Sequence, residues 1–491
     1  MKYDIIIIGG GLGGLVCGCI LSRAGKRLLV LEKGKHTGGC IQSYRRGGME
    51  FDTGFHYVGG LEEGQLLRRV FDYLGLMKLP WKRMDEVVDR VMIGKRTFAL
   101  AQGYDRFAQM LADEFPAKRD ALYQYADLLK RTEEMQLNAL NPHSSDMDFH
   151  TWMLETNAYR YLQEKFDDSL LVDVLSGASL KMELRKDTLP LFTFAHGYCG
   201  YVGSSWRIAG SGSLIAEALA EQIRSQGGEV ICNAEVDELL EKEGQLTGVR
   251  CKDGRIYEGI QFICATHPAE MCRMLKQGGL LKNVYRHRIC RQENTNGMFT
   301  VSLCLKPHAL PYANWNYYVY RHPDIWTYPS DGEIDRVLAA SHVPDDGGEY
   351  VRQIDLLAPM DWSLCRPWIF TQVGKRGPEY EAMKLRMADA CMTLAESCIP
   401  GLRRAVVQCY TSTPLTYRDY VHTPDGSAYG MRKDFNSPFG GMLPVRTPIP
   451  DLFLTGQSLM VHGVQGVTMT ALFTCAEIIG RDWIWKQVIQ K

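Results

Sequence analysis

The residues with the clearest chemical meaning are glycines near the start of the chain, at Gly9, Gly11 and Gly14. They lie between an apolar run and a helix-like stretch that opens with Leu12 and Gly13. In such a strand–turn–helix unit, the first glycine allows a tight turn and the second lets a pyrophosphate approach the backbone. The third lets the helix pack on the strand, with the N–H groups of its first turn aimed at the phosphates. The spacing therefore predicts a dinucleotide site.

A carboxylate stands where the second apolar run of this unit, residues 27–31, comes to its end. At that position the side chain of Glu32 can accept hydrogen bonds from the ribose of an adenosine, and its charge would repel a 2′-phosphate. The site therefore disfavours NADP. Lys33 follows directly, and glycines resume at Gly38 and Gly39.

A second glycine-rich turn lies near the other end of the chain. The short apolar run 452–455 leads into Gly456 and Gln457, and Gly466 and Val467 stand at the start of a helix-like stretch. The N-terminus of that helix can offer backbone N–H groups to the pyrimidine end of a flavin and stabilise negative charge on the reduced ring. The first motif does not separate NAD from FAD, but this second turn favours FAD.

Taken together, these stretches resemble the FAD-dependent amine-oxidase/phytoene-desaturase superfamily, and within it the carotenoid isomerase and retinol saturase branch. The resemblance spans both ends of the chain and part of its middle. The matching stretches are the opening motif, Phe51-Asp52-Thr53-Gly54-Phe55-His56-Tyr57, Thr413-Pro414-Leu415-Thr416-Tyr417, Gly426-Ser427-Ala428-Tyr429-Gly430 and Leu454-Thr455-Gly456-Gln457.

The resemblance implies a division of the cofactor site. Gly9, Gly11, Gly14 and Glu32 would hold the ADP half, Gly38 and Gly39 would lie against the flavin, Glu235 and Val236 near the adenine, Gly456 near the phosphates, and Gly466 and Val467 at the flavin ring. Many members of the superfamily carry Asp after the final Thr-Gly, where this chain has Gln457, so the role of that side chain differs.

The resemblance also implies a long apolar polyene or isoprenoid substrate beside the flavin. Proton donors are then needed, and we select His56, with His462 and Tyr429 in reserve; His196 is a further candidate. Aromatic residues are plentiful in the middle of the chain, although aromatic positions are more often core than tunnel. They are Phe192, Phe194, Tyr198, Tyr201, Trp206, Trp315, Tyr317 and Tyr318.

The elements that must position these residues predict an α/β fold. We expect a Rossmann-type FAD-binding domain built from three separated segments, with an inserted α+β substrate domain. Residues 104–180 have helical spacing, whereas 298–306 and 316–321 are strand-like. The expected FAD-binding segments are 1–75, 205–285 and 441–491, and the expected substrate-domain parts are 76–204 (mainly helical) and 286–440 (mixed sheet plus helix).

Composition excludes several other classes of protein. With a formal net charge of −1 there is no basic patch for nucleic acid, and no His/Cys spacing suggests a metal site. The 15 cysteines are an odd number without a C-x-x-C pair, which favours reduced thiols and a cytoplasmic location. No protein partner is evident. The tail 481–491, with Trp483 and Trp485, predicts either peripheral membrane contact or a helix packed on the protein itself.

Five functions compete at this point. The leading hypothesis is reduction, that is saturation, of a carbon–carbon double bond in a polyene or isoprenoid lipid such as a retinoid or carotenoid. A redox-neutral cis–trans isomerase and a polyene desaturase would use the same fold. An amine oxidase would want an aromatic cage for the amine. A non-catalytic lipid-binding protein of the GDP-dissociation-inhibitor type would not need the glycines and Glu32. Gly210-x-Gly212 follows a poor Rossmann strand, so we expect no NADPH site there, and the electron donor stays open, with NAD(P)H as a candidate.

Overall fold

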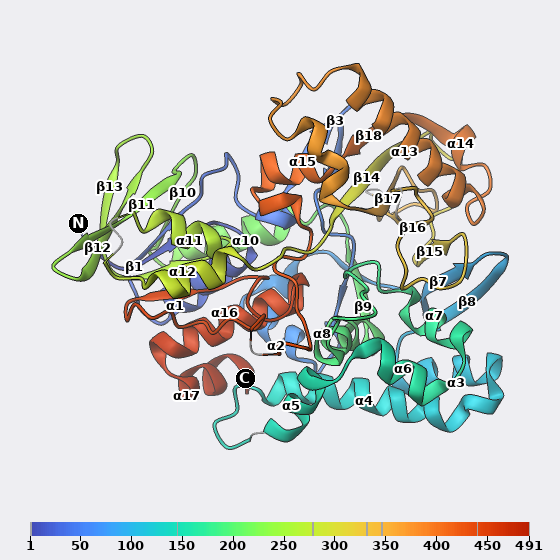
Figure 1. Ribbon diagram of the computed structural model, residues 1–491, viewed down its shortest axis with the longest axis horizontal. Helices are drawn as coiled ribbons and strands as arrows, with labels where there is room; N and C mark the ends of the chain where they lie inside the picture. The colour runs from blue at the N-terminus through green and yellow to red at the C-terminus, as the bar shows by residue number, and fades with distance from the viewer. Residues whose placement is uncertain are drawn as a thin grey trace.

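The computed structural model describes residues 2–144, 146–276, 279–329, 332–344, 347–438 and 440–490. One sheet is assembled from three stretches of chain that are far apart in sequence but lie side by side (Figure 1). Its order is β10 (Glu229–Ile231), β2 (Leu28–Leu31), β1 (Lys2–Ile8), β13 (Ile256–Cys264), β12 (Gln245–Cys251) and β11 (Val236–Lys242), and β19 (Leu452–Leu454) also pairs with β13.

The pairing of this sheet is parallel at its centre. Strand β1 runs parallel to β2 and β13, and β19 runs parallel to the last residues of β13, whereas β12 pairs antiparallel with the first residues of β13. Residues Ile5 to Ile8 are all buried, as expected for a central parallel strand covered on both faces. Helix α1 (Leu12–Arg23) packs against β1 and β2 and contacts both α10 (Ser213–Ser225) and α16 (Gly463–Ile479). Helices α11 (Pro268–Met274) and α12 (Asn283–Cys290) follow β13. The expected fold class, a three-segment Rossmann-type domain, is confirmed.

A second sheet, largely antiparallel, forms the other half of the molecule. Its order is β18 (Val406–Ser412), β14 (Gly297–Leu305), β17 (Gln353–Met360), β16 (Arg336–Ser341), β15 (Asn316–Tyr320), β7 (Val87–Ile93) and β8 (Arg96–Ala101). Helix α13 (Pro378–Glu396) packs against this sheet, and α14 (Leu402–Ala405) leads into β18. Smaller pieces connect the two halves: β3 (Ser43–Arg46), β4 (Met49–Asp52), β5 (Val58–Gly59), α2 (Leu66–Tyr73), β6 (Trp81–Arg83), β9 (Ser205–Ile208) and α15 (Pro414–Thr416).

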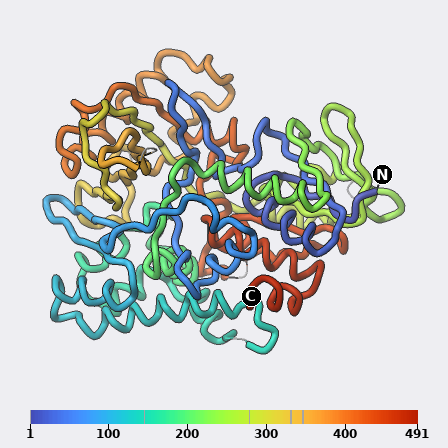
Figure 2. The backbone as a smooth tube through the Cα atoms, turned by 180° about the vertical axis from the view of Figure 1, so that it is seen from behind, coloured from blue at the N-terminus to red at the C-terminus, as the bar shows by residue number. Residues whose placement is uncertain are grey.

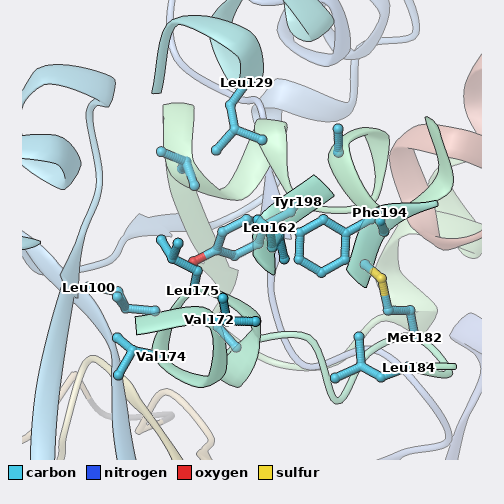
Figure 3. Packing of buried hydrophobic residues seen from close by; sticks show 14 of the residues in the cluster. Leu100, Leu129, Leu162, Val172, Val174, Leu175, Met182, Leu184, Phe194 and Tyr198 are labelled. Carbon is cyan, nitrogen blue, oxygen red and sulfur yellow. The ribbon is translucent and has the colours of Figure 1, made fainter. Parts of the chain in front are cut away.

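A group of helices lies beneath the second sheet, at the lower edge of the view from behind (Figure 2). On α4, Leu122, Tyr125 and Leu129 are buried along one face, as their helical spacing predicts. Aliphatic side chains surround the rings of Phe194 and Tyr198 in this core (Figure 3). The helices are α3 (Tyr104–Glu114), α4 (Arg119–Asn138), α5 (Met147–Glu155), α6 (Ala158–Phe166), α7 (Ser169–Gly177), α8 (Leu191–His196) and α9 (Cys199–Gly203).

The turn at Gly210 and Gly212 has a packing role. Strand β9, which precedes it, pairs with β5 and β6 in a separate small sheet and not with the parallel sheet. The Gly212 N–H donates to Asp52 Oδ1 at 2.7 Å, and a Cβ at Gly212 would lie 2.8 Å from Phe55 Cβ. The turn therefore brings α10 against the segment that contains His56, as expected for a stretch that is not a second dinucleotide motif.

The C-terminal tail packs on the protein itself. Ile484, Val488 and Ile489 are buried, and Arg69 Nη1 donates to the Ile489 carbonyl at 2.9 Å. Helix α17 (Arg481–Ile484) carries Trp483, and the following turn carries Trp485; both indoles are partly buried and pack against the same hydrophobic cluster as α2. Lys491 lies outside the described residues. Among the described helices, none is long and apolar enough to cross a bilayer.

Candidate active site

A cavity of about 590 Å³ runs from the carboxyl ends of β1 and β2, past the N-terminus of α16, to β16 and β17 of the second sheet. The residues selected from the sequence line it, with one exception. They are Gly9, Gly11, Leu12, Gly13, Glu32, Lys33, Gly38, Gly39, His56, Val236, Tyr429, Gly456, Gln457, His462, Gly466 and Val467. The exception is Gly14, where a Cβ would lie 2.1 Å from the Gly9 carbonyl oxygen. Its role is the close packing of α1 on β1, as its place in the motif predicts.

The glycine loop after β1 is packed too tightly for side chains. Gly9 has φ +107°, and a Cβ there would lie 3.1 Å from the Ala265 carbonyl oxygen. The Gly38 N–H donates to the Gly10 carbonyl at 2.8 Å, so the two glycine stretches are held against each other. A backbone surface without side chains is what a pyrophosphate needs for close approach.

Two backbone N–H groups orient the carboxylate of Glu32. Gly10 N donates to Glu32 Oε2 at 2.7 Å, and Gly34 N donates to Oε1 at 2.6 Å. Each carboxylate oxygen can accept a further hydrogen bond, so the group remains able to bind ribose hydroxyls. Lys33 beside it forms an ion pair with Glu235 at 3.5 Å. This end of the cavity fits the adenosine half of a dinucleotide.

The N-termini of α1 and α16 meet at the middle of the cavity. A Cβ at Gly13 of α1 would lie 3.3 Å from Val467 Cγ1 of α16 and 3.4 Å from Thr455 Oγ1. Buried hydroxyl groups without a hydrogen-bond partner stand along the same wall, and such groups are costly unless a ligand satisfies them. They belong to Thr266, Thr423, Ser427 and Thr455. Two positive helix ends and these unpaired hydroxyls fit the phosphates and the polar edge of FAD.

His56 faces the cavity between the two halves of the molecule. Burial lowers its pKa to about 4, although the carboxylate of Asp355 opposes this, so the ring is neutral at pH 7. Its Nδ1 lies 3.6 Å from Asp355 Oδ2. Its Nε2 is buried and makes no hydrogen bond in the described structure, which leaves this atom available to a bound molecule.

The two alternative proton donors, Tyr429 and His462, already face backbone carbonyl groups. The Tyr429 hydroxyl donates to the Leu180 carbonyl at 2.7 Å, and His462 Nε2 lies 2.8 Å from the Lys181 carbonyl. Burial raises the pKa of Tyr429 well above 10.0 and lowers that of His462 to about 4. Both side chains therefore hold the segment 180–181 in place. His196 also lines the cavity, with an unpartnered Nε2 and with Gln136 on its Nδ1.

Lys181 is a cavity-lining residue that the sequence analysis did not select. Its Nζ donates to the Tyr57 hydroxyl at 2.8 Å and lies over the rings of Tyr201, Tyr57 and Tyr198, at 3.6, 5.0 and 5.0 Å from their centroids. Burial lowers its pKa to about 8, against the opposing pull of Asp89. Of the eight aromatic residues considered as tunnel candidates, Tyr201 alone lines the cavity. The sequence signal was a single charged side chain between residues 174 and 182.

Aliphatic and thioether side chains form the far end of the cavity. Leu338 and Leu357 extend from β16 and β17, Met298 from β14, and Leu180 from the segment after α7. The cavity thus has a polar end with a built nucleotide site and an apolar end, with His56 and Lys181 between them. Among the described residues, no group of three or more His, Cys, Asp and Glu could hold a metal ion.

Comparisons with known proteins agree with this geometry. The family model described as flavin containing amine oxidoreductase matches residues 12–355. The chain is 27% identical to human all-trans-retinol 13,14-reductase over 98% of this chain and 86% of the relative, and 24% identical to the chloroplastic prolycopene isomerase of Arabidopsis thaliana over 98% and 83%. A solved structure of putrescine oxidase superposes with a TM-score of 0.64 at 15% identity, covering 98% of this chain and 99% of that one. The chain belongs to the flavin-containing amine oxidoreductase family and is an FAD-dependent oxidoreductase.

Proposed function

We propose that this flavoenzyme reduces a carbon–carbon double bond of a polyene or isoprenoid lipid, such as a retinoid or carotenoid. The observation that supports this most directly is the cavity, which joins a complete nucleotide site to an apolar end lined by Leu338, Leu357 and Met298. The similarity to retinol reductases over nearly the whole chain also supports reduction of the double bond.

Reduction of an alkene needs a hydride and a proton. Reduced FAD supplies the hydride. An unactivated polyene has no carbonyl to hold developing negative charge, so the proton must arrive together with the hydride. His56 has the free Nε2 for this purpose, whereas the hydroxyl of Tyr429 and the Nε2 of His462 already face carbonyl groups. The surrounding apolar side chains exclude water from the reacting carbons.

An amine substrate is disfavoured by the cage of Tyr57, Tyr198 and Tyr201. Amine oxidation calls for an aromatic cage for a substrate cation, but here the chain's own Lys181 fills that cage. A second ammonium group would be repelled by the first.

Delivery of a lipid substrate suggests where membrane contact takes place. Phe370 is 96% exposed and Val373 51% exposed, and the Ile369 carbonyl accepts from Arg418 Nη1 at 2.7 Å. Arg418 and the 55% exposed Tyr420 line the cavity. The loop 369–375 thus projects apolar side chains beside the cavity mouth, with Lys375 at its end, and we assign peripheral membrane contact to this loop in place of the tail.

The electron donor and location complete the proposal. The fifteen free cysteines favour a reducing, cytoplasmic location. We propose NAD(P)H as the external donor that reduces the flavin, and anaerobic mixing of the oxidised holoenzyme with NADH or NADPH tests it through bleaching of the flavin band.

The direction of the reaction is tested with chemically reduced holoenzyme under anaerobic conditions. All-trans-retinol and a cis-carotenoid are the substrates, products are identified by mass, and enzyme without FAD is the control. A gain of two mass units with flavin oxidation supports reduction. An unchanged mass with altered double-bond geometry would make the protein an isomerase. A loss of two units with oxidised enzyme would make it a desaturase.

A further inference from the structure

A buried group of ionisable side chains lies next to His56. At its centre is Asp355 of β17, which is fully buried. One of its oxygens, Oδ2, lies 2.7 Å from His342 Nε2 and 3.6 Å from His56 Nδ1. The other, Oδ1, accepts from Ser302 Oγ at 2.7 Å. A single carboxylate oxygen therefore stands between two imidazole rings.

The charge state of this group follows from its contacts. Burial alone would lower the pKa of His342, but the Asp355 carboxylate outweighs it and the pKa is raised. Burial alone would raise the pKa of Asp355, but His342, His56 and Ser302 hold it below its usual value. His342 and Asp355 thus each stabilise the charged form of the other, while burial keeps His56 neutral at pH 7. The other charged groups that face the three residues are Asp52, whose pKa burial raises to about 7, and Arg207.

A second, small crevice reaches this group from outside the main cavity. Its volume is about 10 Å³, close to the space that one water molecule needs. His342, Asp52 and Arg207 line it, His56 lines both this crevice and the main cavity, and Gly210 at its edge is exposed. His342, Asp355 and His56 therefore connect this crevice, which has an exposed residue at its edge, with the main cavity.

We propose that His342, Asp355 and His56 form a proton relay that supplies the proton for alkene reduction. This inference rests on the proposed function. His56 Nε2–H is the catalytic acid, and Asp355 and His342 are positioning residues that act through it. The relay explains how a neutral imidazole can serve as an acid, because Nδ1 gains a proton as Nε2 loses one.

The atoms and electrons balance as follows. One alkene carbon receives a hydride, and therefore two electrons, from the reduced flavin. The other carbon forms its new C–H bond as the His56 Nε2–H bond breaks. At the same time the proton of His342 Nε2 passes through Asp355 Oδ2 to His56 Nδ1. Water in the crevice returns a proton to His342, and exchange with water in the open cavity after product release restores the Nε2–H form of His56.

The first test needs no turnover. Full-length, FAD-loaded protein with ¹³Cε1-labelled histidine is titrated by NMR, and the two resonances are assigned with His56→Gln and His342→Gln. We expect the His56 resonance to shift as His342 titrates, and this shift to vanish in His342→Gln and in Asp355→Asn. If the chemical shift of His56 in the wild-type protein does not change as His342 is protonated, the relay is wrong.

The second test is anaerobic oxidation of dithionite-reduced enzyme by all-trans-retinol, in H₂O and D₂O across pH. We expect the wild-type rate to fall as pH rises through the pKa of His342. The rate of His342→Gln should be lower by about tenfold or more and should not change over that pH range. The exposed His322→Gln is the matched control. An unaltered pH profile in His342→Gln argues against the relay. If neither retinol nor a carotenoid oxidises the reduced flavin of the wild-type enzyme, the proposed function is wrong. The NMR titration still decides whether the relay exists.

Discussion

The ammonium nitrogen of Lys181 lies 3.6 Å from the centroid of the Tyr201 ring, in the wall of the cavity. Burial of the charged Lys181 lowers the free energy of unfolding of the protein, by an amount that depends on pH. The pKa of Lys181 is lowered from 10.5 to about 8, so between these values the unfolded chain binds a proton that the folded chain does not. The folded state therefore gains stability as pH rises from 8 to 10.5, and the cost is fully present below pH 8.

Lys181→Met removes this cost. We expect the free energy of unfolding of the variant, relative to wild type, to be higher at pH 7 than at pH 10 by about 2 kcal/mol. Denaturant unfolding at both pH values measures it, with the exposed Lys130→Met as control. An equal difference at both pH values would show that Lys181 is not a buried cation.

Purified protein should be yellow, with non-covalently bound FAD, and Glu32→Ala should weaken FAD binding. Loss of a charged acceptor for the ribose hydroxyls costs about 1.5–3 kcal/mol, which is about 10- to 150-fold in Kd. Calorimetric titration of apoprotein with FAD gives the value, and the exposed Glu63→Ala serves for comparison. Unchanged affinity in Glu32→Ala would show that Glu32 does not bind the ribose. A protein that stays colourless in excess FAD would show that FAD is not its cofactor.

His56→Gln should keep its FAD and lose turnover. We expect oxidation of the reduced flavin by a polyene to slow by about 10²- to 10⁴-fold, the range for loss of a general acid. Stopped-flow absorbance of the flavin is the measurement, with the exposed His143→Gln alongside. Full turnover in the variant would exclude His56 from the chemistry.

Tyr429→Phe should have a milder effect. Its hydroxyl donates to the Leu180 carbonyl, so the variant leaves one buried carbonyl without that partner, and the position of Lys181 loosens. We expect a small loss of thermal stability and a higher KM, with the pH dependence of kcat unchanged. A loss as large as that of His56→Gln, with a shifted pH profile, would instead make Tyr429 the proton donor.

Membrane binding should depend on the loop 369–375. Replacing Phe370 and Val373 together by Ser should reduce flotation with liposomes that contain anionic lipid, because both side chains are exposed and contribute little to the core. Trp483→Ser tests the tail separately. If only Trp483→Ser reduces flotation, the C-terminal tail and not the loop 369–375 contacts the membrane.

The nucleotide site was predictable because its chemistry lies within short contiguous stretches. Gly9, Gly11 and Glu32 act through local turn geometry, which the motif specifies directly. The relay was not predictable. His56 meets Asp355 and His342 only because the segment between β4 and β5 lies beside β17 and the residue that follows β16, and sequence periodicity does not reveal such long-range contacts. For the same reason the parallel pairing of β7 with β15 was missed, since these strands lie far apart in the chain.

The late position of β19 and α16 has a consequence for biosynthesis. Residues 455–467 complete the cofactor site, and they are translated after the other residues that line it. The glycine loop after β1 is translated before them and has no opposing wall until then. A complete flavin site therefore exists only after residue 467 has been synthesised, and the helical and sheet parts between the three segments are translated while the nucleotide domain still lacks its last strand.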